Sequence, residues 1–388
     1  MSEEKPVGDQ LDSIEDAIEE IRRGRMVVLV DDEDRENEGD LVVAAEMVSK
    51  ETINFMATHA RGLICLALSP ERVERLGLRQ MVMQNTSPYG TAFTVSIDAA
   101  TGITTGLSAA DRARTIQVAI DDRSGPRELV TPGHIFPLRA QPGGVLIRSG
   151  QTEGSVDLAR LAGLRRAAVI CEILNDDGTM SRLPELFAFR QRHGIKIVSV
   201  AELIRYRVQH ETLIERIAES QLPTTHGAFM LTVYQNRLTE RKHVVLRLGE
   251  FGVDEPVLVR VHRQEMVADL FGRFGATTGD KLGASLELIA AEGKGLVLYI
   301  QSDEPLEPAV VGQIPERQRR RYDPGIEKIR PFYDFGVGAQ ILRDQGLRKL
   351  RVISNNHRAF RGLSGFGLEI VEWVALPEDA NENAGSES

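Results

Sequence analysis

The chain of 388 residues contains only two cysteines, Cys65 and Cys171, which lie far apart in the sequence. Two distant cysteines exclude a disulfide framework and any zinc site of the Cys-x-x-Cys kind. They fit a reducing cytosol, so we expect a cytoplasmic protein. Aromatic residues make up only 5% of the chain, with a single tryptophan, Trp373. The core must therefore be built mainly from aliphatic side chains.

The chain also lacks an excess of basic charge and any long apolar run. Its formal net charge is −10, which argues against a surface that coats nucleic acid or an anionic membrane. A local basic pocket for a small phosphate is still compatible with that charge. No apolar run approaches the ~18 residues of a membrane span, and residues 1–10 do not resemble a signal peptide. We therefore expect neither a nucleic-acid partner nor a membrane partner.

The length and the residue pattern predict two globular domains of the α/β class. Hydrophobic residues make up 42% and charged residues 27%, as in ordinary soluble proteins. The chain is longer than one typical domain, and its pattern changes near residue 210. We predict domains at residues 1–210 and 211–376, followed by a disordered acidic tail at 377–388.

Apolar runs and helical periodicity alternate along both halves. In the first half, a helix begins at Ser13 with Asp16 as an approximate capping box and ends near Gly24. The other predicted helices cover 183–194, 281–292 and 336–345, and the predicted strands cover 26–30, 167–174, 195–200, 257–262, 295–300 and 349–354. Segments 87–98 and 132–154 are rich in Gly, Pro and Thr and predict loops and short strands. Segment 304–325 predicts a surface loop.

The densest group of carboxylates lies in residues 31–40, DDEDRENEGD, directly after an apolar strand. Such a run is often only a solvated loop. However, α/β proteins place their sites at the ends of strands, and crowded carboxylates repel one another unless a cation or sugar hydroxyls relieve them. Hard oxygen ligands suit Mg²⁺ or Mn²⁺.

Two polar turns are candidates for binding a phosphate. In RSGQTEG (148–154), Arg148 offers a planar fork, Gly150 admits backbone N–H groups, and Thr152 adds a hydroxyl before a helical stretch at 156–163. An ordinary turn is the alternative. In TTGLSAADR (104–112), Thr104, Thr105 and Ser108 form either a phosphate loop or a helix N-cap.

Three single residues have both a structural and a catalytic interpretation. His134 lies between loop residues, where a histidine is commonly just exposed. Glu172 lies within an apolar strand, where a carboxylate is costly unless it is paired or functional. Cys65, in GLICLAL, is by default a small buried hydrophobic residue.

Seven long segments occur in order across residues 10–208, and together they resemble 3,4-dihydroxy-2-butanone 4-phosphate synthase of riboflavin biosynthesis. They are DDEDRENEGDL, ATHARGLICLAL, NTSPYGTAFTVSID, TTGLSAADRARTI, PGHIFPLRAQPGGVLIR, TEGSVDLARLAGL and CEILNDDGTMSRLPEL. The resemblance implies an α+β domain with a mixed sheet. It also implies a homodimer with sites near the subunit boundary, and conversion of ribulose 5-phosphate into 3,4-dihydroxy-2-butanone 4-phosphate and formate, with Mg²⁺ or Mn²⁺.

The resemblance assigns roles to particular residues. Glu36 matches the metal ligand, Arg35 and Asp40 match sugar-binding residues, and His134 and Glu172 match the two residues essential for turnover. The remaining matches are active-site positions Asp31, Glu38 and Cys65, and the phosphate loop formed by Arg148, Ser149, Gly150, Gln151 and Thr152. The family's loop reads Arg-Gly-Gly-His-Thr-Glu, and its histidine is a second metal ligand. Gln151 stands in that place, and its side-chain oxygen can still bind a hard cation.

The second half resembles GTP cyclohydrolase II over residues 212–376. The matching pieces are LPTTHGAF, VLVRVH, DLFG, GLVLYI, DFGVGAQILRDQGL, ISNN and GFGLEIVE. The family's three zinc-binding cysteines are replaced by Glu265, Ala276 and Thr278, residues 301–313 replace an Arg-rich segment, and Tyr333 replaces an arginine. We therefore expect a fold without zinc and without GTP hydrolysis. Two alternatives stay open: a bifunctional enzyme that also acts on GTP, and, because of Gln151, a non-catalytic regulator that binds ribulose 5-phosphate or a flavin precursor.

Overall fold

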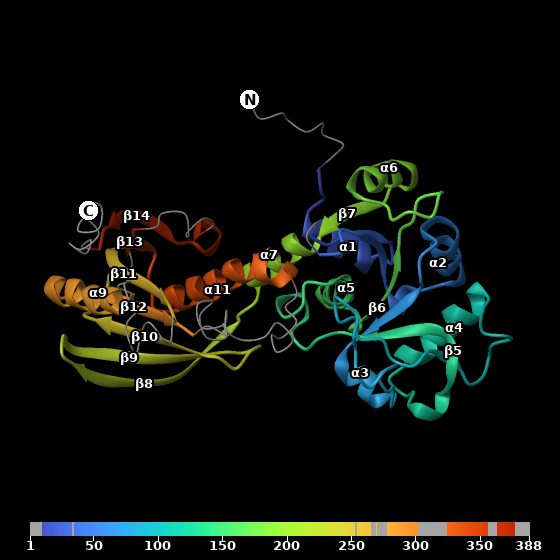
Figure 1. Ribbon diagram of the computed structural model, residues 1–388, viewed down its shortest axis with the longest axis horizontal. Helices are drawn as coiled ribbons and strands as arrows, with labels where there is room; N and C mark the ends of the chain where they lie inside the picture. Colours follow the sequence, from blue (N-terminus) through green and yellow to red (C-terminus); the bar gives the residue numbers. More distant parts are fainter. Residues whose placement is uncertain are drawn as a thin grey trace, which may run out of the picture. The chain divides into compact units, whose positions relative to one another are not determined.

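The computed structural model describes residues 10–32, 35–252, 254–264, 269, 278–301, 324–355 and 363–376. The chain divides into two compact units, of which the first ends at Arg207 and the second begins at Val208 (Figure 1). The start of helix α11, up to Arg330, is grouped with the first unit. Each unit contains a seven-stranded sheet with both parallel and antiparallel pairs. The predicted α/β class, with a mixed sheet in the first domain, is therefore confirmed.

The first sheet has the strand order β4-β5-β3-β6-β2-β1-β7. Its strands are β1 (Val27–Val30), β2 (Gly39–Ala44), β3 (Cys65–Leu68), β4 (Ile97–Ala99), β5 (Leu129–Arg139), β6 (Ala167–Glu172) and β7 (Lys196–Ser199). Only the β1–β7 and β3–β5 pairs are parallel among these neighbours. As a result, β1 and β6 end at the same edge of the sheet at which β2 and β3 begin.

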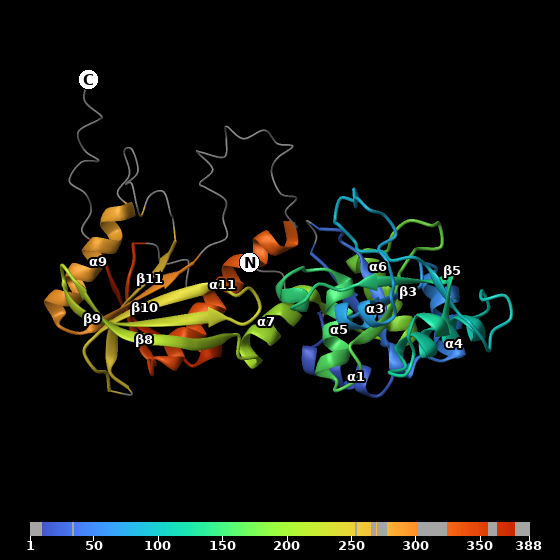
Figure 2. The same cartoon turned by 90° about the horizontal axis from the view of Figure 1, so that it is seen from below.

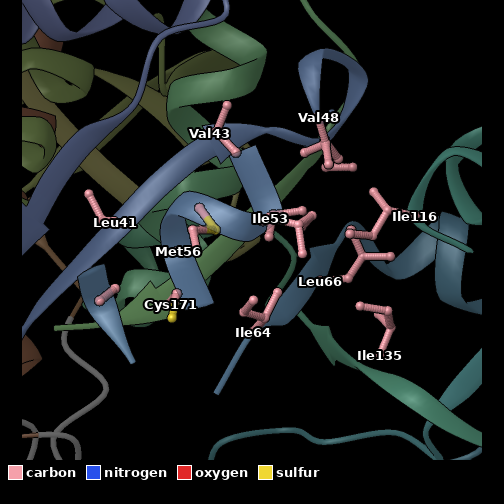
Figure 3. Packing of buried hydrophobic residues seen from close by; sticks show 14 of the residues in the cluster. Leu41, Val43, Val48, Ile53, Met56, Ile64, Leu66, Ile116, Ile135 and Cys171 are labelled. Atoms are coloured by element: carbon pink, nitrogen blue, oxygen red, sulfur yellow. The ribbon is translucent and has the colours of Figure 1, made fainter. Parts of the chain in front are cut away.

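Helices cover both faces of this sheet. They are α1 (Ile14–Arg22), α2 (Lys50–Phe55), α3 (Pro70–Arg75), α4 (Ala109–Ile120), α5 (Gln151–Leu161), α6 (Leu183–His193) and α7 (Val200–His210), and a short π-helix, η3 (Met56–Ala60), follows α2. Figure 3 shows the aliphatic core on one face, with Ile53 of α2 and Ile116 of α4 near Leu66 of β3. Helix α5 contacts β6, β2, β3 and β1, and it lies on the other face.

Local sequence signals explain several helix ends. The Ser13 hydroxyl accepts a hydrogen bond from the Asp16 N–H, as an N-cap does, so the predicted start of α1 is confirmed. Helix α6 ends at Gly194, which has a left-handed conformation with φ of 67°. The Ser108 hydroxyl accepts from the Asp111 N–H at the start of α4, which supports the N-cap interpretation of segment 104–112.

The prediction of loops and short strands for segment 132–154 was partly wrong. Strand β5 runs for 11 residues and includes His134, and α5 begins at Gln151. The start of α5 was not predicted because its glycines are typical of a loop. A Cβ on Gly154 would lie 2.6 Å from the Leu29 side chain, so glycine here permits close packing of α5 on β1.

The second unit has the strand order β14-β13-β11-β12-β10-β9-β8. Its strands are β8 (Ile214–Thr224), β9 (Gly227–Asn236), β10 (Lys242–Leu248), β11 (Pro256–Arg263), β12 (Gly295–Ile300), β13 (Lys349–Ile353) and β14 (Glu369–Val374). The predicted strands at 257–262, 295–300 and 349–354 are confirmed. Figure 2 shows the long β8–β9 hairpin and, beside the sheet, helix α9 (Thr278–Glu292), which contributes Ile289 to the core.

Helix α11, whose start is grouped with the first unit, is longer than predicted. Helix α11 covers Pro324–Asp344, whereas periodicity predicted only 336–345. Proline at the first turn fits a helix start, because its missing N–H has no partner in a helix anyway. The other part of the predicted loop 304–325, residues 304–323, lies outside the described residues, as does the tail 377–388. Among the described helices, none has the length and apolar character that crossing a bilayer requires.

A buried histidine should make the second unit acid-sensitive. Burial, and then the charge of Arg241, lowers the pKa of His243 from 6.5 to about 4, and its Nδ1 accepts the Gln301 N–H at 3.2 Å. The folded state disfavours the imidazolium, so His243 costs the protein no stability above pH 6.5, where the ring is neutral in both states. As the pH falls towards 4, the ring becomes protonated in the unfolded state, and the free energy of unfolding decreases by an amount on the order of 3 kcal/mol. Urea unfolding followed by the fluorescence of Trp373, in β14, should show this loss.

Variant His243→Asn supplies the comparison for that measurement. The asparagine oxygen can accept the same backbone N–H, but the side chain does not titrate. We expect the variant to lose less stability than the wild type between pH 6.5 and 4.5, because only the wild type must protonate a buried ring. Equal losses in the two proteins would show that other groups cause the acid sensitivity.

Candidate active site

The acidic loop, residues 31–40, is organised around the buried side chain of Asp31. Residues 33 and 34 lie outside the described residues. The carboxylate of Asp31 accepts from Arg35 Nη1 at 2.8 Å, from the Glu36 N–H at 3.1 Å and from the Glu38 N–H at 2.8 Å. These three bonds fold the loop back at the end of β1. Asp31 therefore shapes the loop that presents Glu36 and Glu38.

Arg35 links the acidic loop to helix α5. Its buried guanidinium donates to Gln151 Oε1 at 3.0 Å and lies 3.4 Å from the Glu36 carboxylate. The same guanidinium stacks over Tyr89 at 5.4 Å, and the Tyr89 hydroxyl donates to the Arg35 carbonyl. Arg182 clamps the loop from the other side by donating to the carbonyl oxygens of Glu36 and Asn37.

Carboxylates are crowded at the edge where β2 begins and β6 ends. Asp40 and Glu172 are direct partners in the β2–β6 register. Burial, and then the charge of Glu172, raises the pKa of Asp40 well above its usual range. Burial also raises the pKa of Glu172, and burial with the neighbouring Glu36 raises the pKa of Glu38 to about 7. The edge therefore holds more negative charge than its surroundings neutralise.

A backbone N–H fixes the orientation of Glu172. The Leu63 N–H donates to Glu172 Oε2 at 2.8 Å. Leu63 follows the end of the π-helix η3, where Arg61 takes a left-handed conformation with φ of 71°. This conformation is uncommon for a residue other than glycine, and it turns the chain so that the next N–H groups face the end of β6.

His134 is oriented by Asp98, a residue of β4. The Asp98 carboxylate lies 2.7 Å from His134 Nδ1 and also accepts the His134 backbone N–H at 3.0 Å. Gly106, with φ of 91°, closes over this pair, since a Cβ there would lie 2.3 Å from the Asp98 carboxylate and 2.5 Å from His134 Nδ1. The His134 side chain is 40% exposed, so part of the ring is accessible to a ligand.

The sheet register places His134 and Glu172 at the same edge of the sheet. Cys65, the first residue of β3, pairs with Phe136 on one side and with Ile170 on the other. His134 stands two residues before Phe136 in β5, and Glu172 is the last residue of β6, two residues after Ile170. Both residues therefore lie at the edge of the sheet at which β3 begins.

The candidate phosphate turn lies at the start of α5. Arg148 donates to Glu153 at 2.6 Å and to the Tyr89 carbonyl at 3.2 Å, so it fixes the turn. A Cβ on Gly150 would lie 2.4 Å from the Arg148 guanidinium, so a larger residue there would displace the Arg148 side chain from the turn. Gln151 and Thr152 are buried in the first helical turn, whose N–H groups have no partner within a helix and favour anions. Ser149 is also buried here.

Two further predicted site residues have different surroundings. Thr105 is exposed, between Thr104 and Gly106, and the N–H groups of these two neighbours donate to Asp111. Cys65 is buried, and burial followed by the charge of Glu172 raises the pKa of its thiol. The thiol form therefore persists at neutral pH, as expected for a small buried hydrophobic residue.

The residues at this edge fit a hard divalent cation. Burial first, and then neighbouring carboxylates, raise the pKa values of Glu38, Asp40 and Glu172, and a bound cation would oppose this shift. Glu36 offers a half-buried carboxylate, and the side-chain oxygen of Gln151 points to the same guanidinium. No complete site of three His, Cys, Asp or Glu ligands occurs in the part of the chain that the structure describes. Mg²⁺ commonly binds through few protein ligands, with substrate and water as the others.

Crowded carboxylates beside an anion-binding helix start define a site for a phosphorylated, hydroxyl-rich small molecule. Comparison with known proteins agrees with this class. Residues 15–206 match the family model described as 3,4-dihydroxy-2-butanone 4-phosphate synthase, and residues 215–375 match GTP cyclohydrolase II. The chain is 50% identical to the riboflavin biosynthesis protein RibBA of Aquifex aeolicus, over 96% of this chain and 94% of that protein.

Other relatives carry the synthase name alone. The 3,4-dihydroxy-2-butanone 4-phosphate synthase of Pseudomonas aeruginosa is 48% identical, over 94% of this chain and 99% of that protein. A crystal structure of RibBX, a two-domain synthase from A. baumannii, matches with a TM-score of 0.76 and 43% identity, over 94% of this chain and 100% of that one. A synthase structure in complex with two magnesium ions matches 52% of this chain and 98% of that one, with a TM-score of 0.50 and 44% identity.

The chain therefore belongs to the 3,4-dihydroxy-2-butanone 4-phosphate synthase family of riboflavin biosynthesis, and it is an enzyme of that class. This confirms the resemblance found in the first half of the sequence. The second half is a GTP cyclohydrolase II domain by its family match. The replaced positions Glu265 and Ala276 lie outside the described residues, and the side chain of Thr278 is likewise not described.

Sequence reasoning missed three groups that shape the site: Asp98, Arg182 and the Leu63 N–H. Asp98 ends the segment FTVSID, in which alternation places it with Thr94 and Ser96 on the polar side, so it resembled an ordinary surface residue. Arg182 lies just before α6, with no pattern that distinguishes it from a surface arginine. A backbone donor such as the Leu63 N–H leaves no signal in a sequence.

Proposed function

We propose that residues 1–210 form the synthase domain, which converts ribulose 5-phosphate into 3,4-dihydroxy-2-butanone 4-phosphate and formate with Mg²⁺ or Mn²⁺. One observation carries the proposal: His134, held by Asp98, and Glu172, held by the Leu63 N–H, lie at one edge of the sheet, beside carboxylates with raised pKa values. Several protons move in this reaction, which requires more than one acid or base group.

The chain's own residues divide the work among binding, orientation and proton transfer. The start of α5 binds the substrate phosphate through backbone N–H groups, and Arg35 and Asp40 bind sugar hydroxyls. With Nδ1–H donating to Asp98, Nε2 of His134 is free to accept a proton. Burial raises the pKa of Glu172, so this carboxyl is better suited than an ordinary one to pass a proton to the substrate. Cys65, Asp31 and Glu38 complete the walls of the site.

Glu36 and Gln151 would hold the divalent cation. The bound cation would polarise two neighbouring substrate oxygens and so favour an enediol. Arg35 would orient both ligands, because its guanidinium contacts each of them. Glu36 keeps a half-buried carboxylate for this role, whereas Asp31 is fully engaged with the loop.

Formate release tests the proposal directly. The full chain and its 1–210 fragment are incubated with ribulose 5-phosphate and Mg²⁺, and formate is measured. A one-domain relative that covers 52% of this chain has its own structure, so the fragment is a reasonable folding unit. Comparable formate release by both supports the assignment. A folded full chain that binds Mg²⁺ without releasing formate would instead favour the non-catalytic regulator.

Exchanging Gln151 for histidine should change the metal preference. A neutral amide oxygen suits a hard ion, whereas an imidazole nitrogen favours ions later in the first transition row. We expect Gln151→His to tighten Mn²⁺ more than Mg²⁺, which isothermal titration of both ions measures. Unchanged affinities for both ions would show that residue 151 belongs only to the phosphate turn.

We infer that the second domain neither binds a catalytic zinc nor opens GTP. Residues 211–388 contain no cysteine, whereas the resembling family uses three thiolates at its zinc. Metal analysis of the purified full chain and a GTP turnover assay test this inference. One equivalent of tightly held zinc, or formate formed from GTP, would restore the bifunctional alternative. We further expect a cytoplasmic homodimer, which light scattering of the purified protein checks for its assembly.

A further inference from the structure

The first domain has a cavity at the sheet edge opposite the candidate active site. Its volume is about 470 Å³, and it lies where β3 ends at Leu68 and β6 begins at Ala167. The candidate active site lies at the other ends of these two strands, near Cys65 and Glu172. Strand β6 separates the two places by about 17 Å, at 3.4 Å per residue. The cavity is therefore distinct from the site described above.

Arginine side chains dominate the lining of this cavity. Arg72, Arg75, Arg165 and Arg166 line it, together with only two carboxylate residues, Glu71 and Asp122. The chain as a whole has a net charge of −10, so the local excess of positive charge at this cavity is opposite in sign to the charge of the whole chain. Isoleucine and alanine side chains form an apolar part of the wall.

Two of the four arginines are held in place by the protein. Arg72 donates to the carbonyl oxygens of Ala119 and Asp121 at the end of α4. Arg165 pairs with Glu46 at 2.8 Å and reaches Asp122 only at 3.5 Å. Both guanidinium groups are therefore positioned by other elements before any ligand arrives, which lowers the entropic cost of binding.

The other two arginines make no side-chain hydrogen bond or ion pair within the residues that the structure describes. Arg75, in the last turn of α3, and Arg166, just before β6, are both exposed. Besides burial, the like charges of Arg75 and Arg165 lower the pKa of Arg72. Four guanidinium groups thus surround one volume, and two of them make no direct ion pair among the described residues, while the charge of Arg166 acts on nearby Glu71.

We propose that this cavity binds a dianionic phosphate monoester, with the phosphate held by Arg75, Arg166 and the anchored Arg72. With Arg165 paired to Glu46, the other three guanidinium groups against the carboxylates of Glu71 and Asp122 leave one positive charge, which favours an anionic ligand. Guanidinium groups match phosphate oxygens in geometry, since each offers paired N–H donors. The apolar wall beside them takes the organic part of the ester. The contacts at this edge do not involve His134, Glu172 or the acidic loop.

Inorganic phosphate serves as the probe, titrated into the full chain at low ionic strength by calorimetry. The test variant is Arg75→Gln with Arg166→Gln, and the matched control is Arg79→Gln with Arg127→Gln. The control pair is also exposed and removes the same charge, but it lies outside the cavity. Phosphate can also occupy the catalytic turn, so the wild type and the control should each show two binding events.

The test variant should keep one phosphate site and weaken the other at least about 10-fold, because each lost bond involves a charged group. Its kcat/KM for ribulose 5-phosphate should stay at the wild-type value, which also shows that it is folded. Identical isotherms for the wild type and the test variant would overturn the proposal. Equal weakening in the control would also overturn it, since the effect would then be one of net charge alone.

Discussion

Replacing Glu172 by glutamine should lower turnover by about 10²-fold or more and, at the same time, make the metal-free protein more stable. The loss of activity follows from the removal of a positioned acid/base group. The gain in stability follows from charge. Burial and neighbouring carboxylates raise the pKa values of Asp40 and Glu172 above those of an unfolded chain. Folding at neutral pH therefore opposes their ionisation, and stability is lost as the pH rises through that range.

The glutamine variant keeps most of the local structure. Its side-chain oxygen can still accept the Leu63 N–H, which Glu172 accepts at 2.8 Å. The melting temperature should rise by about 2–4 °C for each kcal/mol regained. Magnesium should stabilise the wild type more than the variant, because only the wild type carries the full carboxylate charge. Glu15→Gln, the same exchange at an exposed position of α1, is the control and should change neither quantity.

Two results would count against this account. Turnover near the wild-type level would remove Glu172 from the acid/base groups. A lower melting temperature in the metal-free variant would show that the Leu63 bond outweighs the charge crowding. Calorimetry separates the melting of the two domains, and formate release measures turnover. If removing a carboxylate charge stabilises the folded protein, then that charge does not serve folding, and binding of a charged ligand explains why it is there.

Strands β1, β6 and β7 of the first sheet could be predicted from the sequence because they are continuous apolar runs. The four residues of β1, for example, are all buried. Strand β3 is equally buried, but it was not predicted as a strand. Helix α5 could not be placed correctly, because Gly150 and Gly154 resemble a loop. Their purpose is close packing, of the turn on Arg148 and of the helix on Leu29. A tertiary contact of this kind is invisible to local periodicity.

At the candidate site, too, local patterns could be recognised in the sequence, whereas contacts between distant residues could not. Charged residues at strand ends, such as Asp40 and Glu172, were visible because a carboxylate next to apolar runs is unusual. The contact between Arg35 and Gln151 was not visible, since it joins residues more than a hundred positions apart. The sequence also could not show that Arg148 is tied to Glu153 rather than free to bind a phosphate. Residue types were predictable, whereas their partners depended on the fold.

Replacing Asp98 by asparagine should lower turnover almost as far as removing His134 itself. Asp98 touches no part of the substrate in this account, so it is a positioning residue. Its carboxylate accepts both the His134 backbone N–H and Nδ1–H. In Asp98→Asn the amide oxygen must stay on the backbone N–H, because the amide NH₂ would otherwise meet another donor. The NH₂ group then faces Nδ1 and favours the tautomer with the proton on Nε2.

That tautomer cannot accept a proton from the substrate at Nε2, so we expect turnover to fall by about 10²–10⁴-fold, as when other enzymes lose the correct histidine tautomer. Substrate binding should change little. Long-range proton–nitrogen NMR of the His134 ring reports the tautomer directly, and a purely structural role for Asp98 would leave that spectrum unchanged. Because the two residues act as one unit, the double variant Asp98→Asn with His134→Ala should be no worse than His134→Ala alone. Independent, multiplying losses would mean that Asp98 serves the fold of the 104–112 loop instead of the histidine.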